Sequence, residues 1–234
     1  MAKILWAVTG AGQWMRESAK IFEEVAQEHE VTVIFSRSGY EVARLYGVLK
    51  IFEKYTGGYY REMEVDPQPL SHVYGRVMSR KYDLTILAPA TANTIAKIAY
   101  GIADNLITTT FAMARKSKTP SIILPTDAPW VKKTTLPCLI RNCLKCEICP
   151  PQEVCPTQAI ENVKGNRRII LSKCIGCEAC VSSCPFGAIS CFEEVEMNMD
   201  ELDVLNLIKV MRLGFIVVHD PSELRSKIRE VLMS

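Results

Sequence analysis

Residues 83–106 read DLTILAPATANTIAKIAYGIADNL. This stretch begins with an uninterrupted apolar run at residues 84–88, and a helical segment follows at about residues 91–100. A strand that is apolar at every position has no solvent-facing side, so we expect it to lie inside a parallel sheet that is covered on both faces. A strand that leads directly into a helix is the repeating unit of such a sheet.

The same pattern extends in both directions from this unit. Four apolar runs have the length of a strand: residues 3–8, 31–35, 84–88 and 121–124. Between the first two, residues such as Phe22 and Ala26 recur at helical spacing, and another helix is expected through residues 111–114. The alternation predicts an α/β fold with a Rossmann-like (flavodoxin-like) parallel sheet and helices on both faces. Residues 55–70 are rich in turn-forming Gly and Pro, and no element is assigned there.

The α/β pattern resumes near the C-terminus. Leu202, Leu205 and Ile208 mark a helix, residues 215–218 a strand, and residues 224–232 a closing helix. A lone strand and helix can hardly bury their apolar faces alone, so we expect this tail to dock on the first domain. The segment before it is then an insertion. The predicted boundaries are 1–137 for the first part of the α/β domain, 138–192 for the insert and 193–234 for the returning tail.

The composition excludes several classes of protein. The chain has 234 residues, of which 48% are hydrophobic and 23% charged, and its formal net charge is +2. This balance fits neither a disordered chain nor a strongly basic nucleic-acid binder. The N-terminal apolar run is too short for a signal peptide, and no run is long enough to span a membrane. We therefore expect a cytoplasmic protein with no nucleic-acid and no membrane partner.

The ten cysteines all lie between Cys138 and Cys191. Two stretches of this segment are copies of one unit, in which a CxxCxxC triplet is followed by Cys-Pro: residues 143–156 and 174–185. A secreted disulfide scaffold would spread its cysteines along the chain, whereas tight clustering with two-residue gaps favours metal. Three thiolates at these gaps place one sulfur on each of three irons of a cubane, and the fourth iron takes its ligand from elsewhere.

The Cys-rich module closely resembles the bacterial two-cluster ferredoxin, in which the cysteine before the proline binds the cluster of the other repeat. The resemblance implies two [4Fe-4S] clusters with crossed ligands: Cys143, Cys146, Cys149 and Cys184 for the first, and Cys174, Cys177, Cys180 and Cys155 for the second. The first repeat departs from the pattern, because five residues rather than three precede its last cysteine, and we expect only a longer loop. Zinc would usually take paired CxxC knuckles, and disulfides fit such triplets poorly. Cys138 and Cys191 are left over, and we expect thiols with no ligand role.

A candidate phosphate site follows the first strand. Residues 9–13 read TGAGQ, a turn whose glycines let the backbone close around an anion at the start of the next helix. The third glycine of the dinucleotide fingerprint is missing, because Met15 stands in its place, and a plain tight turn is the alternative. After the second strand, Ser36, Arg37 and Ser38 occupy the position where an NAD enzyme would place an acidic residue. Hydroxyls with a nearby Arg suit the phosphate of a mononucleotide or the 2′-phosphate of NADP.

Residues 89–94, PATANT, and residues 101–106, GIADNL, look like two motifs of the homo-oligomeric flavin-containing cysteine decarboxylase superfamily, whose members bind FMN between subunits. The resemblance covers most of residues 1–125. The cofactor-binding residues that it implies are Thr9, Gly10, Ala11, Gly12, Gln13, Ser36 and Ser38 for the phosphate and ribityl end, Pro89, Ala90, Thr91 and Asn93 for the isoalloxazine ring, and Asp104 and Asn105 at the subunit contact. From the residues alone, Thr91 and Asn93 also suit a purely structural role at a helix start.

The chain departs from the decarboxylases of that superfamily. They use a His ahead of the helix after the third strand and a Pro-x-Met-Asn-x-x-Met-Trp clamp, whereas here His72 lies farther upstream and residues 125–130 read PTDAPW. We expect His72 to be an ordinary surface or capping histidine. The combination of parts is more similar to the branch of archaeoflavoprotein and dihydromethanopterin reductase (acceptor), in its archaeal form with a ferredoxin insert.

This likeness implies an FMN- and iron–sulfur-dependent oxidoreductase that reduces 7,8-dihydromethanopterin to 5,6,7,8-tetrahydromethanopterin. Electrons would come from ferredoxin or another low-potential donor, and the protein would form a symmetric homo-oligomer with FMN at subunit interfaces. No catalytic residue is assigned, and the proton could come from solvent, His72 or Tyr100. The alternatives are an electron-transfer adaptor between ferredoxin and a partner enzyme, and a flavin-dependent cysteine decarboxylase in which the clusters would be idle.

Overall fold

A computed structural model describes residues 1–67 and 70–233 of the chain. Its centre is a six-stranded sheet in the order β12-β5-β4-β1-β2-β3, and every neighbouring pair of strands is parallel. The strands are β1 (Lys3–Val8), β2 (Glu30–Phe35), β3 (Met63–Val65), β4 (Leu84–Ala90), β5 (Ser121–Pro125) and β12 (Ile216–Val217). The predicted parallel α/β sheet is therefore confirmed.

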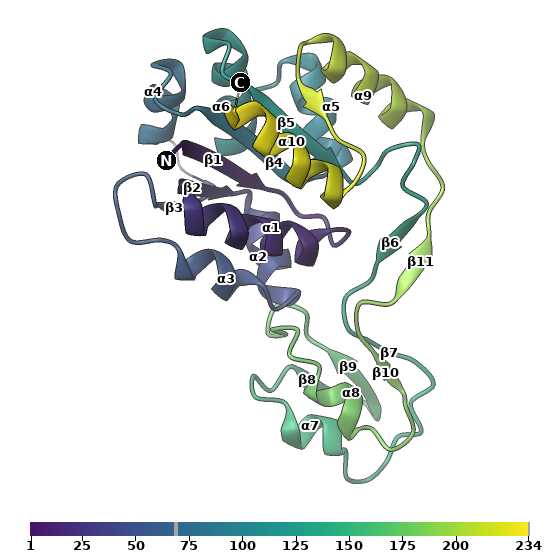
Figure 1. The fold of residues 1–234 in the computed structure, drawn as a ribbon. Helices are drawn as coiled ribbons and strands as arrows, with labels where there is room; N and C mark the ends of the chain where they lie inside the picture. Colours follow the sequence, from purple (N-terminus) through teal and green to yellow (C-terminus); the bar gives the residue numbers. More distant parts are fainter. Residues whose placement is uncertain (68–69, 234) are drawn as a thin grey trace.

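Helices cover both faces of this sheet (Figure 1). One face is covered by α1 (Met15–Glu28), α2 (Arg37–Leu45), α3 (Leu49–Lys54) and α10 (Pro221–Met233). The other is covered by α4 (His72–Met78), α5 (Ala92–Tyr100), α6 (Leu106–Ser117) and α9 (Glu201–Arg212). Strand β1 shows why both helix layers are needed. Trp6 packs with the first layer and Leu5 with the second, and both side chains are fully buried.

The C-terminal tail returns to the sheet as expected. Strand β12 adds to the edge of β5, with Ile216 opposite Ile122. Helix α9 is present as expected, but the residues that it buries are not the apolar residues that marked it in the sequence. Leu207 and Val210 are buried, whereas Leu205 is 56% exposed. The marker residues Leu202, Leu205 and Ile208 thus lie on the outer side of the helix, and the apolar character of α9 extends around it.

In the sheet domain, four short elements have no counterpart in the sequence prediction: β3, α2, α3 and α4. Strand β3 has only three residues, all half-buried at the edge of the sheet, so it lacks the continuous apolar run that marks the inner strands. It lies in the stretch 55–70 that was left unassigned. Residues 68 and 69 of that stretch lie outside the described residues.

Two chain segments connect the Cys-rich insert to the sheet domain (Figure 1). The chain leaves through β6 (Lys133–Thr135) and returns through β11 (Glu194–Glu196), which pair antiparallel. Inside the insert, β7 (Leu139–Ile140) pairs with β10 (Ile189–Ser190), and β8 (Ile160–Val163) pairs with β9 (Asn166–Ile169). Helix α7 (Pro150–Val154) follows the first cysteine triplet, helix α8 (Ala179–Ser183) begins within the second and contains Cys180, and the two helices pack against each other. Each strand pair thus joins one repeat to the other.

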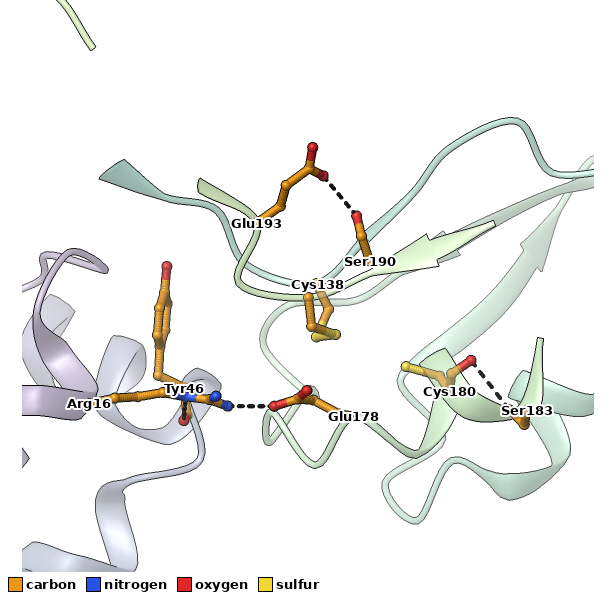
Figure 2. The surroundings of a disulfide bond; sticks show 9 residues. Arg16, Tyr46, Cys138, Glu178, Cys180, Ser183, Ser190 and Glu193 are labelled. Atoms are coloured by element: carbon orange, nitrogen blue, oxygen red, sulfur yellow. Dashed lines mark hydrogen bonds and ion pairs between the residues drawn. A yellow bond between two sulfur atoms is a disulfide. The ribbon is translucent and has the colours of Figure 1, made fainter. Parts of the chain in front are cut away.

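Cys138 and Cys191 form a disulfide, and the expectation of two separate thiols was wrong (Figure 2). The two residues come together because they stand immediately before β7 and after β10, where Leu139 is paired with Ser190. The bond joins the two chain segments where they enter and leave the insert. In the part of the chain that is described, no helix has the length and apolar character needed to cross a membrane.

Candidate functional site

The predicted flavin loops meet at one edge of the sheet. Strands β1, β2 and β4 are parallel neighbours, so the turns after Val8, Phe35 and Ala90 all emerge at their carboxyl ends. Chain connections run outward from β1 to β2 and β3, and then resume on the other side of β1 with β4. The reversal places a topological switch point between β1 and β4, and open α/β sheets bind their ligands at such a point.

Thr9 ties two of these strand ends together. Thr9 is 1% exposed. Its Oγ1 donates to the carbonyl oxygen of Pro89 at 2.8 Å, and this Oγ1 also accepts the N–H of Thr91 at 2.9 Å. Because both of these bonds stay within the protein, Thr9 holds the β4 loop in place beside the glycine turn. Its hydroxyl therefore acts on a ligand through the loops that it positions.

The glycine turn is packed closely against the loop after β2. A Cβ atom on Gly10 would lie 2.6 Å from the Cβ of Ser38, which is closer than real Cβ atoms come. Ser36 caps α2 by accepting the N–H of Gly39 at 2.9 Å, and the side chain of Ser38 is exposed. The bare backbone of Gly10 thus lies directly against the start of α2. Backbone N–H groups at a helix start suit an anion, so these two segments are a candidate phosphate cradle.

Gln13 carries a polar atom that has no partner in the described chain. Its Oε1 is buried and accepts no hydrogen bond, although a buried amide oxygen normally has one. Gln13 sits at the end of the glycine turn, beside a groove that also touches Gly12, Trp14 and Tyr46. A ligand that carries hydroxyl donors, such as the ribityl chain of FMN, would satisfy this oxygen.

The start of α5 lies on the β4 side of this switch point. Thr91 is the N-terminal flanking residue of α5, and its Oγ1 lies 3.1 Å from that of Thr94. Asn93 is exposed on the first turn. The N–H of Ala92 is capped by Asp127, whose Oδ2 accepts it at 3.0 Å. Sequence reasoning missed this role of Asp127, because a cap from a strand end 35 residues away leaves no local signal.

Asp104 and Asn105 organise the start of α6. Asn105 caps the helix by accepting the N–H of Thr108 at 2.9 Å, and Thr108 closes the capping box. Asp104 bonds to Lys97 at 2.6 Å, and this hydrogen bond lowers the pKa of the Asp104 carboxyl. Both residues therefore have a local structural role that is independent of any cofactor.

The two candidate proton donors lie in different places. His72 is the first residue of α4, directly after the capping Ser71, and it lines an open groove with Tyr59 and Arg76. Tyr100 is the last residue of α5, at the opposite end of that helix from Thr91, and is 62% exposed beneath the ammonium of Lys209. Among the described residues, neither side chain lies at the switch point between β1 and β4.

The four cysteines predicted for the first cluster line a single cavity in the insert: Cys143, Cys146, Cys149 and Cys184. The rest of its wall is largely apolar and includes Ile140, Pro151 and Ile189. Cys184 comes from the second repeat and the other three from the first, so the strand pairing between repeats brings them together. The backbone N–H of Ala188 points to the Cys184 sulfur at 3.4 Å.

The four cysteines predicted for the second cluster also lie within reach of one another. Burial raises the pKa of the Cys174 and Cys180 thiols, and the nearby thiols of Cys177 and Cys155 raise both further by like-charge repulsion. At Cys155, burial opposes ionisation, but the N–H of Ala159 at 3.2 Å and other backbone donors outweigh it and lower the pKa. This N–H matches the one that Ala188 directs at Cys184, so the two repeats present equivalent sulfurs.

Two family models match the chain in order. Residues 1–166 match the family described as Flavoprotein. The chain belongs to the Flavoprotein family. Residues 167–190 of this flavoprotein match a second model, the 4Fe-4S binding domain, which spans the second cysteine triplet and Cys184.

The flavoprotein is similar over nearly its whole length to two archaeal proteins named dihydromethanopterin reductase (acceptor). The protein of Methanosarcina mazei is 36% identical over 229 residues, which make up 94% of this chain and 95% of the relative. That of Methanocaldococcus jannaschii is 38% identical over 228 residues, or 92% of this chain and 91% of the relative. Among solved structures, DmrB of Burkholderia xenovorans in complex with FMN has a TM-score of 0.65 and 22% identity, and the likeness covers 99% of this chain and 96% of DmrB. That likeness shows the shared fold.

The two family models indicate that the flavoprotein uses a flavin and [4Fe-4S] chemistry. Within residues 1–67 and 70–233, no three or more His, Cys, Asp or Glu side chains are gathered to hold one metal ion. The four cysteines that bind a [4Fe-4S] cluster lie farther apart than the ligands of a single metal ion, because each of the four irons takes one thiolate. The two sets of four thiols, each with a backbone N–H on its Cys-Pro sulfur, fit that chemistry, and the unpartnered Gln13 oxygen beside the glycine turn fits a bound flavin.

Proposed function

We propose that this flavoprotein reduces 7,8-dihydromethanopterin to 5,6,7,8-tetrahydromethanopterin, with electrons from ferredoxin or another low-potential donor that pass through two [4Fe-4S] clusters to FMN. The observation that carries the proposal is the likeness to the two dihydromethanopterin reductases, because it runs through the sheet domain and the insert together. A relative that shared only one module would not link the two cofactors to one reaction.

We assign the cluster ligands in the crossed pattern. The first cluster takes Cys143, Cys146, Cys149 and Cys184, and the second takes Cys174, Cys177, Cys180 and Cys155. The common cavity of the first set and the mutual effect on the thiol pKa values within the second set support this assignment. The proposed limits of the modules are residues 1–137, 138–192 and 193–234, and the neck formed by β6 and β11 supports them.

We assign the FMN site to the switch point between β1 and β4. The backbone of residues 9–13 and the hydroxyls of Ser36 and Ser38 would hold the phosphate and ribityl end. Pro89, Ala90, Thr91 and Asn93 would line the ring, and Asp104 and Asn105 would stand at the subunit contact. FMN supplies the conversion that the reaction needs, since it takes up electrons singly and releases them as a hydride.

We also propose that the chain assembles with copies of itself through the surface of α5 and α9. Helices α5 and α9 pack side by side, and their outward side chains are unusually apolar for a protein surface: Tyr100, Ile102, Leu202, Leu205, Ile208 and Met211 are each at least 40% exposed. Contiguous exposed apolar side chains of this kind mark interaction sites. In the proposed assembly this surface is covered by another subunit.

The test is an anaerobic assay of dihydromethanopterin reduction by the protein loaded with FMN and iron, with reduced ferredoxin as donor. We expect formation of tetrahydromethanopterin that depends on both cofactors. A Cys177→Ala variant, which retains FMN, should lose ferredoxin-driven turnover. Electron uptake from ferredoxin without any pterin reduction would reject the reductase and favour an electron-transfer adaptor.

A further inference from the structure

The insert touches the sheet domain through the loop of its second cysteine set. A Cβ atom on Gly176 would lie 2.3 Å from the carbonyl oxygen of Leu45 and 2.9 Å from the backbone nitrogen of Gly47, so the two backbones meet directly. Arg44 adds a hydrogen bond from its Nη1 to the carbonyl oxygen of Cys174 at 3.2 Å. The loop that binds one cluster is thus docked at the end of α2, the helix whose first turn forms the phosphate cradle.

Arg16 joins the same loop to the flavin side of the sheet domain (Figure 2). It lies on the first turn of α1, directly after the glycine turn. Its Nη2 bonds to Glu178 at 2.7 Å, its Nε donates to the carbonyl oxygen of Tyr46 at 3.2 Å, and its guanidinium lies 3.7 Å from the centre of the Phe192 ring. Glu178 stands between Cys177 and Cys180 in the second triplet. The side chain of Arg16 therefore links α1 to the turn after α2, to the neck and to the cluster loop.

Tyr46 completes a continuous path to the glycine turn. Its ring packs on Phe192 with centroids 4.8 Å apart, and its hydroxyl donates to the carbonyl oxygen of Thr135 at 2.7 Å. A Cβ atom on Gly12 would lie only 2.0 Å from that hydroxyl. From Gly12 through Tyr46, Phe192 and Arg16 to Glu178, each group is in contact with the next.

Among the residues that the structure describes, the first cysteine set has no such connection to the sheet domain. The position equivalent to Gly176 is Lys145, which has the same left-handed backbone, with φ of 55° against 63°, but an exposed side chain. The cavity of the first set is lined only by residues of the insert, and its neighbours Leu144 and Phe186 are 65% and 57% exposed. The loop before α7 lies at the end of the insert away from the sheet (Figure 1).

We infer that Cys155, Cys174, Cys177 and Cys180 hold the flavin-facing cluster, that the other set holds the outer cluster, and that Arg16, Tyr46, Phe192 and Glu178 are positioning residues that fix the flavin-facing loop against the glycine turn. The inference rests on the proposed cofactor sites. Each transfer moves one electron from a reduced cluster to FMN, so one is oxidised as the other is reduced, and no covalent bond in the protein changes. An external donor would then reach the chain at the outer cluster.

The experiment needs no pterin, so its outcome is separate from that of the reductase assay. Protein holding FMN and both clusters is photoreduced by a short flash under nitrogen, and the sharing of electrons between clusters and flavin is followed by absorbance and by EPR of rapidly frozen samples. In Cys146→Ala we expect the remaining cluster to exchange electrons with FMN as fast as in the parent protein. In Cys177→Ala we expect exchange with the remaining cluster to slow by about a hundredfold or more, because the near partner is gone.

The positioning residues are tested by Arg16→Gln and Glu178→Gln, with Lys133→Gln as the matched control. Lys133 also forms an exposed ion pair, with Glu194 at 2.9 Å, but it lies on the neck away from the cluster loop. Arg16→Gln should slow exchange by about tenfold. In EPR-monitored titrations it should lower the potential of the flavin-facing cluster alone, and Glu178→Gln should raise it, because the two side chains carry opposite charges. The inference is overturned if Cys146→Ala abolishes the exchange and Cys177→Ala spares it, or if Arg16→Gln behaves like Lys133→Gln.

Discussion

Gly10 and Ser38, which lie on different loops, are in contact so close that Gly10 has no room for a side chain, since a Cβ atom there would come within 2.6 Å of the Ser38 Cβ. Replacing Gly10 with Ala should push the loop after β2 away from the glycine turn and open the phosphate cradle. We expect FMN to bind about tenfold more weakly, which corresponds to about 1.4 kcal/mol and lies within the usual cost of overpacking. Fluorescence titration of the flavin-free protein with FMN measures the change.

Gly75→Ala is the control for that variant. Gly75 lies in α4, and a Cβ atom there would meet no atom within 4 Å. The substitution should leave FMN affinity unchanged and stabilise the helix by about 0.5–1 kcal/mol. Unaltered FMN binding by Gly10→Ala would show that the cradle between Gly10 and Ser38 does not hold the phosphate.

The crossed pattern of cluster ligands can be tested with double variants of Cys184. Under the proposed assignment, Cys146→Ala and Cys184→Ala remove ligands of the same cluster, so the double variant should keep about four irons, like either single variant. Cys177→Ala combined with Cys184→Ala should lose both clusters. Iron analysis and EPR of proteins purified under nitrogen give the counts.

Uncrossed ligation predicts the reverse result. Cys177 and Cys184 would then serve one cluster, and their double variant would retain about four irons. FMN content is the internal control, because all three substitutions lie in the insert. A protein that loses FMN together with iron would point to a collapse of the fold instead of a ligand effect, and the single variants identify which substitution causes it.

The sheet was predictable because its inner strands are apolar at most positions. Strand β4, for instance, is buried along all seven of its residues, and that is what a continuous apolar run indicates. The edge strand β3 is half-buried throughout and has no such signal. In helix α9 the apolar residues did not indicate the buried side. Leu205 and Ile208 lie on the outer surface, whereas the polar Asn206 is buried.

The ligand residues were predictable from spacing, whereas the contacts between the modules were not. Cysteine triplets are local in the sequence, and a known repeat assigns their partners. Arg16 and Glu178 are 162 positions apart, and neither stands in a pattern that sets it apart from other surface charges. A glycine at position 176 is already explained by the cysteine loop, so the sequence gives no separate sign of its contact with Leu45. That contact is seen only in the structure.

The apolar surface of α9 should control assembly. Replacing Leu205 and Ile208 with Glu would put two charges where the proposed neighbouring subunit covers apolar side chains, and burying them without partners is costly. We expect a smaller species by size-exclusion chromatography with light scattering, and loss of FMN, since the proposed site lies between subunits. Met78→Glu, at a side chain 50% exposed on α4, should leave the mass unchanged. An unchanged mass in the Leu205 and Ile208 double variant would exclude this surface.

The disulfide between Cys138 and Cys191 predicts a specific thiol count. After denaturation and removal of iron, eight cysteines should react with an alkylating agent, since eight are free in the structure and two are bonded. All ten should react after treatment with a reductant. Mass spectrometry of the alkylated chain identifies the protected pair. Ten reactive thiols before reduction would mean that the bond is absent in the purified protein.

Asp203 should make the protein less stable as the pH rises. Burial raises the pKa of this carboxyl, and the charges of Asp127 and Asp200 raise it further, so the folded state holds the proton more tightly than the unfolded chain. A raised pKa means that stability is greatest when the group is protonated and falls as the pH passes through the folded pKa. Asp203→Asn removes that penalty and should raise the Tm near neutral pH by about 1–3 °C.

The advantage of Asp203→Asn should shrink as the pH is lowered toward the usual range of aspartate titration, because the carboxyl is then protonated in both states. Asp104→Asn is the control with the opposite sign. The hydrogen bond from Lys97 lowers the pKa of Asp104, so its contribution is favourable at neutral pH and is lost as the pH falls. Calorimetry of both variants between about pH 3 and about pH 7, which spans the usual range of aspartate titration, separates the two cases. A pH-independent difference at Asp203 over that range would show that its neighbours do not disfavour its charge.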